Sequence, residues 1–437
     1  MKKKLAAVMA VIMSATMLMA GCTDKKPSET DVSANVITQE GEEGGQTDGE
    51  AGSSPSSEDG DTTGTAPESE NAAEVWEQLT ETTVKQDVSI QTVDYNSRYA
   101  YNTLNEDEKA LYVAILEAAK TCTFKVRVSD AVTTEVWAKV YGMVYNQEPQ
   151  LFYMNSKVKV GKVYYTENDA AKIAQMQKEI DAVADKLVAE ANGKSTTYEK
   201  LKVFHDYLVL NSTFEKKEET VEYNGSIYNA LAHDSSTQGN IQCSGYAKAM
   251  QYLCDKSGIE SMIVTGTNKD EFSHAWNVVK VDGAWYNIDA TWDDPILKTP
   301  DITNIRYNYF LVPDSWIHNK THFNVNKHKL SFGSITYFTP PACTETAQNY
   351  FVKNNKVYSD FTSADKAIKD ALQQAADGKL RTAQIMVSSK DVYDQIVGKD
   401  KDYNTWVKDN SKKNSVKGIA NDSNDSMLLI EFDVIYN

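Results

Sequence analysis

The sequence predicts an α+β protein, and two observations support this prediction. Several segments repeat apolar residues at alternating three- and four-residue spacing, which is typical of helices with one buried face. Two neighbouring runs rich in β-forming residues, 272–281 and 284–291, are joined by Asp282-Gly283, a strong signal for a two-residue hairpin turn. The chain has 437 residues, which is enough for two or three folded domains.

The N-terminal residues have the pattern of an export signal, and we expect residues 1–21 to be removed as a signal peptide. Three lysines precede an apolar run, 5–20, which is too short for a spanning helix. The run ends in small residues before Cys22 and resembles a bacterial lipobox, with an ordinary signal-peptidase site as the alternative. A lipobox predicts that Cys22 is lipidated and anchors the protein to a membrane at the bacterial cell surface or in the periplasm.

Residues 22–75 are predicted to be a disordered acidic tether. They are rich in Glu, Asp, Gly, Ser and Thr and nearly lack large apolar side chains, so they cannot bury enough surface to offset the entropy of ordering. Most of the net charge of −17 lies in this segment. Since the remainder has no concentration of basic residues, nucleic acid is not expected as a partner.

Residues 76–195 are expected to form an α-rich N-terminal domain. Asn105 followed by Glu108 predicts a capping box that opens a helix. A strand-like pair, 150–154 and 158–165, precedes a long helix. The apolar stripe of that long helix is expected to be core rather than a binding surface, and it consists of Ile173, Met176, Ile180, Val183 and Leu187.

Residues 196–335 are expected to form the core that carries the chemistry. Thr196 with Glu199 predicts a second capping box, ahead of a helix whose buried face includes Phe204. His205 lies beside that face and is expected to be structural.

Cys243 is predicted to lie at the N-terminus of a further helix. After the polar stretch 233–242, apolar residues recur at helical spacing until Gly258 ends the pattern. Free amide N–H groups and the positive end of the helix macrodipole stabilise a thiolate at such a position. Cys254 lies on the apolar side of the same helix and is expected to be an inert core thiol.

The predicted hairpin brings a histidine and an aspartate to one face of the sheet. With a two-residue turn at Asp282-Gly283, the paired positions are Val281 with Ala284, Trp276 with Asp289, and His274 with Thr291. His274 and Asp289 are then diagonal neighbours, roughly 7–8 Å apart at the backbone, from where their side chains can form a hydrogen bond. A slip of one residue would put them on opposite faces.

Cys243, His274 and Asp289 are therefore the parts of a Cys-His-Asp triad. His274 would take the thiol proton and return it to a leaving amine, while Asp289 would fix the ring tautomer and stabilise the imidazolium. The backbone N–H of Cys243 is the expected first donor to an oxyanion, and Gln238 and Gln242 are both candidates for the second.

Three ordered stretches, 242–250, 273–295 and 309–311, resemble the bacterial transglutaminase-like superfamily, a relative of the papain-like thiol fold. The resemblance includes the spacing of 31 residues from the cysteine to the histidine and 15 from the histidine to the aspartate. It implies a papain-like core in which the helix bearing the cysteine packs against an antiparallel sheet bearing the other two residues. The superfamily includes cross-linking enzymes, peptidases, amidases and inactive scaffolds, so the resemblance does not choose the acyl acceptor.

No metal or cofactor is expected. The carboxylates in 292–295 are more simply explained by a strand-ending turn than by a metal site. His318, His322 and His328 lack flanking cysteines or a glutamate motif, so they are expected at the surface or the core edge.

The cysteines other than Cys22 do not resemble a disulfide scaffold, because they are few and dispersed. A bridge between Cys122 and Cys343 stays open.

Residues 340–437 are expected to form a C-terminal α+β domain with a substrate-positioning, wall-associating or stabilising role. Tyr350–Tyr358 is strand-like, Ser363 is expected to cap a helix, and 383–387 and 427–435 are expected to be strands.

Two classes of function remain. The first is a surface-anchored thiol enzyme that cleaves or transfers the acyl group of a Gln side chain or peptide amide through a thioester on Cys243. Its substrates would be proteins or peptides, with peptidoglycan stem peptides within reach of a tethered enzyme. The second is a non-catalytic cell-surface binding or scaffold protein that retains the fold. The complete set of triad residues favours the enzyme.

Overall fold

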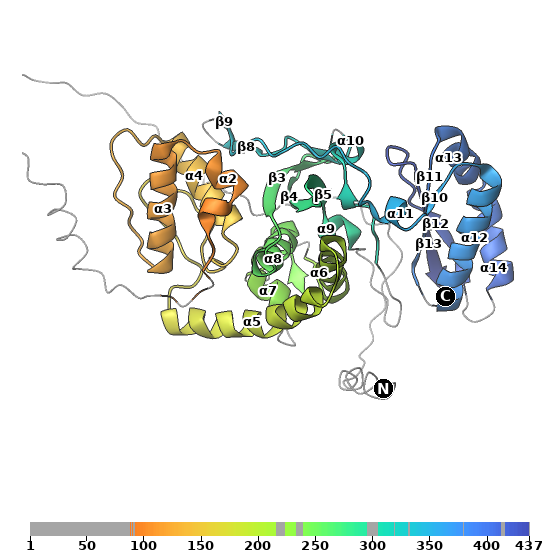
Figure 1. Cartoon of the computed structure of the whole chain (residues 1–437), viewed down its shortest axis with the longest axis horizontal. Helices are drawn as coiled ribbons and strands as arrows, with labels where there is room; N and C mark the ends of the chain where they lie inside the picture. Colours follow the sequence, from red (N-terminus) through yellow and green to blue (C-terminus); the bar gives the residue numbers. More distant parts are fainter. Residues whose placement is uncertain are drawn as a thin grey trace, which may run out of the picture. The chain divides into compact units, whose positions relative to one another are not determined.

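The computed structural model describes residues 88, 90, 92–215, 223–232, 239–294, 305–318, 320–330, 333–378, 380–411 and 416–436 (Figure 1). The predicted signal peptide, lipidation site and tether lie outside these residues, as does Gln238. Within the described part of the chain, no helix is both long enough and apolar enough to cross a membrane.

The N-terminal segment is mainly helical, as predicted. Its elements are the 3-10 helix η1 (Tyr95–Ser97) and the helices α2 (Tyr99–Asn102), α3 (Glu106–Lys120), α4 (Thr134–Gln147) and α5 (Ala170–Asn192). The capping box of Asn105 and Glu108 opens α3. The stripe along α5 faces the core, with Val183 partly buried and the other predicted positions buried.

The predicted strand pair at 150–154 and 158–165 is wrong. Only isolated bridges occur there, such as the one between Met154 and Tyr165. Two antiparallel backbone bonds form, from the Asn155 N–H to the Tyr164 carbonyl and from the Thr166 N–H to the Tyr153 carbonyl, both at 2.8 Å. The pairing does not extend further, because the Val163 N–H donates to the Phe124 carbonyl and the Gly161 carbonyl accepts from the Val126 N–H, both at 3.1 Å.

The second segment combines helices with a five-stranded antiparallel sheet. Its helices are α6 (Thr197–Asn211), α7 (Ile227–Leu231), α8 (Cys243–Lys256), α9 (Ala290–Asp293) and α10 (Asp314–Ile317). The sheet has the order β6-β5-β4-β3-β7, with β3 (Ser261–Asn268), β4 (Ser273–Val281), β5 (Ala284–Ile288), β6 (Phe310–Val312) and β7 (His322–Phe323). Two smaller pairs are β1 (Thr213–Phe214) with β2 (Asn240–Ile241), and β8 (Lys327–Leu330) with β9 (Gly333–Thr336).

Helix α8 lies against the central strands of this sheet (Figure 1). Almost every residue of the helix is buried, and Asn277 Nδ2 of β4 donates to the Ala247 carbonyl of α8 at 2.9 Å. The capping box of Thr196 and Glu199 opens α6, whose buried face also packs in this core. The predicted α+β fold, with the cysteine-bearing helix packed on an antiparallel sheet, is confirmed.

The hairpin register is as predicted over most of its length. Asp282 and Gly283 have φ of 50° and 85°, as a two-residue turn of the I′ type requires, and the pairing runs from Val281↔Ala284 to Asn277↔Ile288. Beyond that point the predicted pairs do not form. Strand β5 ends at Ile288 because Asp289 turns to cap α9, and its backbone N–H donates to the Tyr309 carbonyl at 3.0 Å.

The N-terminal helices and the second segment share one hydrophobic core. Gln147 lies at the end of α4, and its side-chain amide bonds to the backbone of Ile263 in β3. It donates to the Ile263 carbonyl at 2.6 Å and accepts from the Ile263 N–H at 3.2 Å. Arg98 is buried and pairs with both Glu148 and Asp255. These contacts hold β3 and α8 against the N-terminal helices.

The C-terminal segment has its own core and a sheet of order β10-β11-β13-β12. Its elements are α11 (Tyr350–Lys353), β10 (Val357–Tyr358), α12 (Phe361–Gly378), β11 (Thr382–Val387), α13 (Lys390–Val397), α14 (Asp400–Asn410), β12 (Val416–Asn421) and β13 (Leu429–Tyr436). The predicted strands at 383–387 and 427–435 correspond to β11 and β13.

Two local predictions for this segment are wrong. Tyr350–Tyr358 begins as a helix, because the Asn349 side chain accepts from the backbone N–H groups of Phe351 and Val352. Ser363 lies inside α12, where its backbone N–H donates to Asp360 Oδ1 at 2.9 Å. The cysteines of the described residues are all free, so Cys122 and Cys343 are not bridged.

Candidate active site

Cys243 is the first residue of α8 and is completely buried. Gln242 is the N-cap, and its backbone N–H donates to the Asn224 carbonyl at 2.9 Å. Gly245 lets that segment approach the first turn, because a Cβ there would lie 2.7 Å from the same Asn224 oxygen. In the described chain the Gln242 side chain forms no capping bond to α8. The N-cap side chain therefore leaves the first-turn N–H groups of α8 to other partners, and the Gly245 N–H donates to the Gln242 carbonyl at 2.8 Å.

His274 lies on β4, opposite Gly266 of β3, and its ring connects the thiol to a carboxylate. His274 Nε2 lies 2.6 Å from Asp289 Oδ2, and the Cys243 side chain also acts on the imidazole, for which Nδ1 is the remaining nitrogen. Burial alone would lower the pKa of His274. The charge of Asp289, its hydrogen bond and the contact with Cys243 outweigh burial and raise that pKa to about 10.

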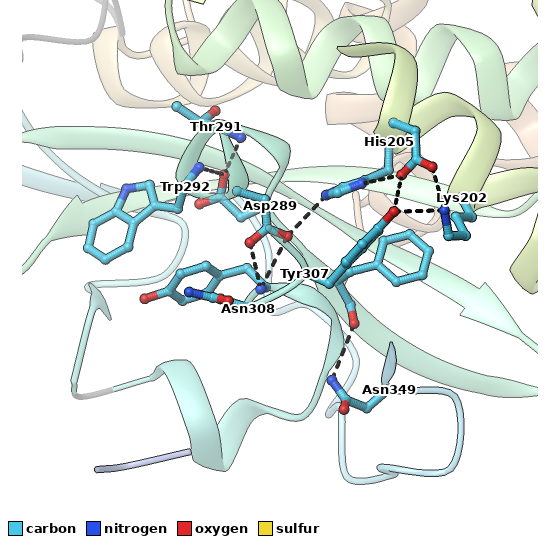
Figure 2. A network of polar contacts seen from close by, with 12 residues as sticks. Lys202, His205, Asp289, Thr291, Trp292, Tyr307, Asn308 and Asn349 are labelled. Atoms are coloured by element: carbon cyan, nitrogen blue, oxygen red, sulfur yellow. Dashed lines mark hydrogen bonds and ion pairs between the residues drawn. The ribbon is translucent and has the colours of Figure 1, made fainter. Parts of the chain in front are cut away.

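Asp289 lies at the end of β5 and is the N-cap of α9. Its Oδ1 accepts from the backbone N–H groups of Thr291 and Trp292, at 2.9 and 3.2 Å, as Figure 2 shows. Its Oδ2 is left for imidazole nitrogens. Burial would raise the pKa of Asp289, but the charge and the hydrogen bonds of the surrounding histidines hold it well below its usual range.

The structure thus brings together the three predicted triad side chains. The diagonal cross-strand geometry expected for His274 and Asp289 is replaced by a shorter contact, in which Asp289 reaches the imidazole from a helix cap. Two tryptophans pack on the imidazole: Trp276 is stacked on it at 5.8 Å between ring centroids, and Trp292 is tilted over it at 5.9 Å. The low polarity of these rings strengthens charge interactions in the site.

His322 belongs to the site, and the prediction that it lies at the surface or the core edge is wrong. Its side chain is fully buried, and its Nε2 lies 2.8 Å from Asp289 Oδ2. It follows Asp289 by 33 residues and lies on the short strand β7. No periodic pattern connects such a strand to the rest of the sheet, so the sequence contains no local signal for this contact.

His205 is structural, as predicted, and Figure 2 shows the polar network around it. It is fully buried on α6, with Nε2 at 3.0 Å from Asp293 Oδ2 and Nδ1 at 3.2 Å from Asp206 Oδ1. Burial opposes the charged ring, but the hydrogen bonds to the two carboxylates raise the pKa of His205. Asp293 Oδ1 also accepts from the Tyr309 N–H at 3.0 Å, so α6, α9 and the start of β6 are fixed to one another.

Two clusters among the described residues have the donor types of a metal site. His274, Asp289 and His322 form one, and Asp422, Glu431 and Asp433 form the other. In the first, both imidazoles already lie at hydrogen-bond distance from one Asp289 oxygen. In the second, the Arg306 guanidinium pairs with all three carboxylates. Hydrogen bonds and an ion pair therefore account for both clusters.

Comparison with known proteins places this site in a family. Residues 182–290 match the family model described as the transglutaminase-like superfamily, and this segment contains all three triad residues. This segment belongs to the transglutaminase-like superfamily. A transglutaminase-like domain indicates cysteine-dependent acyl transfer or proteolysis in general terms.

Two curated relatives match a part of the chain. The kyphoscoliosis peptidases of Homo sapiens and Mus musculus are 28% and 27% identical to it over 99 residues. The aligned part is 20% of this chain and only 15% of each relative's length. The similarity therefore concerns a part of each protein and not the whole of either.

Two solved structures align with a part of the chain. A TGase crystal structure aligns with 28% of this chain and 33% of its own, at 20% identity and a TM-score of 0.23. The periplasmic domain of TgpA from Pseudomonas aeruginosa, bound to ethylmercury, aligns with 26% of this chain and 44% of its own, at 17% identity and a TM-score of 0.22.

Proposed function

We propose that this protein is a thiol acyltransferase or amidase that acts on a Gln side chain or a peptide amide through a thioester on Cys243. One observation supports the proposal above all others. The His274 imidazole is hydrogen-bonded to the buried Asp289 carboxylate, and the Cys243 side chain is close enough to raise the pKa of the same ring. An imidazole that takes a proton from sulfur at one nitrogen, while a carboxylate holds its other N–H, has the arrangement that nucleophilic catalysis needs.

The proposed reaction has two halves. In the first, the thiol proton passes to His274, whose raised pKa favours the imidazolium, and the Cys243 sulfur attacks the amide carbonyl carbon. The C–N bond then breaks as His274 gives that proton to the departing nitrogen. In the second, an amine or water attacks the thioester carbon, His274 accepts its proton, and the thiol is restored as the C–S bond breaks. The backbone N–H of Cys243 is the proposed donor to the oxyanion in both halves, with Gln242 or Gln238 as the second.

The activity is tested by offering the purified protein a glutamine-containing protein and a fluorescent amine. We expect amine incorporation by the wild-type protein and a loss of at least roughly 1,000-fold in Cys243→Ala, because no other group supplies the thioester. Cys254→Ala is the matched control, since Cys254 is a buried thiol in the same helix and burial raises its pKa. Release of new amino termini without incorporation would identify proteolysis, and release of ammonia without incorporation would identify a glutamine amidase. If none of the three products forms, the protein is a binding protein.

We also propose that the protein is lipid-anchored through Cys22 at the cell surface or in the periplasm, where proteins or peptidoglycan stem peptides are its substrates. Cys22→Ser is expected to move the full-length protein from the membrane fraction to the soluble fraction, because the acceptor of the lipid is lost. Fractionation followed by immunoblotting measures the change. Persistence in the membrane fraction would contradict the anchor and leave the proposed chemistry unaffected.

A further inference from the structure

His322 lies beside the triad, and the reaction proposed above gives it no step. Its ring is fully buried, 5.2 Å from the His274 ring and 4.6 Å from the Trp276 ring between centroids. A buried imidazole has to satisfy both of its nitrogens, and each one that stays unbonded costs free energy. The partners of these two nitrogens therefore indicate what the residue does.

The sheet is built so that β7 can bring His322 to this place. His322 pairs with Asn268 of β3, and His274 pairs with Gly266 of the same strand, so the two histidines share a face of the sheet. Gly266 has no side chain on that face, so the space beside the two histidines is left for other groups. A Cβ at Gly266 would lie 2.4 Å from the Phe323 carbonyl oxygen and 3.2 Å from the Trp276 ring. Position 266 thus permits the close packing that places the second imidazole against the site.

Both nitrogens of His322 have partners that define one tautomer. Nδ1 lies 2.8 Å from Thr321 Oγ1, and Nε2 lies 2.8 Å from Asp289 Oδ2. Because the Asp289 carboxylate can only accept, Nε2 carries the proton, and in the neutral ring Nδ1 then accepts from the Thr321 hydroxyl. Burial lowers the pKa of His322 to about 4, so this neutral form is present at neutral pH.

We propose that His322 is a positioning residue of the active site, which donates from Nε2 to the same Asp289 oxygen that accepts from His274 and so fixes the carboxylate that orients the catalytic imidazole. The inference rests on the proposed function and adds a fourth side chain to the triad. Asp289 is held on its other oxygen by Thr291 and Trp292. With His322 in place, both oxygens have two donors.

This arrangement has two physical consequences. First, the carboxylate cannot rotate about its terminal bond without losing at least one charge-assisted hydrogen bond. Second, two N–H donors on Oδ2 make that oxygen less basic, so the Nε2 proton of His274 stays on the ring and Nδ1 is the nitrogen that exchanges a proton with the thiol. Without His322, only His274 would hold Oδ2.

The test uses variants of the full chain at position 322. His322→Phe keeps a ring but removes the donor, while His322→Gln keeps an N–H near the position of Nε2. The first measurement is the rate of alkylation of Cys243 by iodoacetamide, located by mass spectrometry. The second is kcat and KM for amine incorporation. Melting curves establish that each variant is folded.

We expect His322→Phe to slow alkylation and lower kcat by roughly 10- to 100-fold, the range for a lost hydrogen bond to a charged group, with KM nearly unchanged. His322→Gln is expected to recover most of that loss. His318→Gln is the matched control, because His318 also packs edge-on against Trp276 but bonds to Asp314 and not to the triad. It is expected to react as the wild type does.

Three results would overturn the inference. One is a folded His322→Phe variant within about threefold of the wild type, since a lost charge-assisted bond costs more than that. Another is a Gln variant as slow as the Phe variant, which would mean that His322 acts through packing alone. If the Phe variant does not fold, His322→Leu removes the donor with a smaller side chain, and an unchanged alkylation rate in that variant would also overturn the inference. By contrast, a wild-type Cys243 that is alkylated no faster than in His274→Ala would refute the proposed function itself.

Discussion

Asp289→Asn is expected to slow amine incorporation by roughly 1,000- to 10,000-fold without unfolding the protein, the range known for removal of the carboxylate from such a triad. The reason lies in which atom faces His274. Oδ1 accepts two backbone N–H groups, so the amide nitrogen of an asparagine cannot take that place and has to occupy the position of Oδ2. An N–H would then point at His274 Nε2, which would have to become an acceptor. The ring proton would move to Nδ1, where it blocks transfer from the thiol.

The measurements for Asp289→Asn are kcat for amine incorporation and the rate of alkylation of Cys243. Asp293→Asn is a matched control, because Asp293 is also a buried carboxylate of the α9 turn bonded to an imidazole, that of His205. We expect Asp293→Asn to lower the melting temperature but to leave the catalytic rate within a few-fold of the wild type. An Asp289→Asn variant within tenfold of the wild-type rate would show that the carboxylate does not set the tautomer of His274.

The sequence was sufficient for the parts of the site that depend on local chemistry. Capping boxes predict the starts of α3 and α6 because the cap and its partner are three residues apart. The turn at Asp282-Gly283 fixes the register of β4 and β5, and with it the side of the sheet that His274 faces. The apolar spacing that begins after Cys243 predicts the start of α8, and so it places Cys243 at the N-terminus of that helix.

Other parts depend on interactions that no local pattern encodes. The hairpin was expected to continue through Asp289, but a carboxylate that caps the next helix satisfies two backbone N–H groups, and this competes with strand pairing. His322 joins the site through the edge strand β7, whose place beside β3 depends on the open face at Gly266. The segment at 150–165 lacks a full ladder because the backbone of 161–163 bonds to that of 124–126. For His322 and for this segment, a long-range contact replaced the structure that the pattern predicts.

Lys248→Met is expected to raise the free energy of unfolding at pH 7 by on the order of 3 kcal/mol. The variant removes a buried amine, which on folding has either to lose its proton or to lose the water around its charge. Lys248 is 3% exposed on α8, and its Nζ lies 3.5 Å from the centroid of the Tyr145 ring. Burial lowers the pKa of Lys248 from 10.5 to about 7. The contact with the ring offsets part of this cost, and its loss in the variant reduces the gain by about 2 kcal/mol or less.

The pH dependence separates this effect from better packing. The unfolded chain holds the Lys248 proton up to pH 10.5 and the folded chain only up to about 7, so this residue makes stability rise with pH between those values. His274 has the opposite effect, because its folded pKa of about 10 lies above the value of 6.5 for an ordinary histidine, and its contribution is lost as pH rises through that window. In the wild type the two slopes oppose each other. Lys248→Met removes only the rise in stability that Lys248 contributes, so the advantage of the variant should shrink by about 1.4 kcal/mol per pH unit.

Urea unfolding at pH 7.5 and 8.5 measures both quantities. At these pH values most cysteine and tyrosine side chains of the unfolded chain still hold their protons, so they change the stability less than Lys248 does. Lys256→Met is the matched control, since Lys256 ends the same helix but pairs with Asp181 and Asp185, and these hydrogen bonds raise its pKa despite partial burial. That control should be less stable than the wild type by an amount that does not change between the two pH values. A Lys248→Met variant whose advantage is absent, or is the same at both pH values, would mean that the amine stays charged inside the fold, with the Tyr145 ring as sufficient compensation.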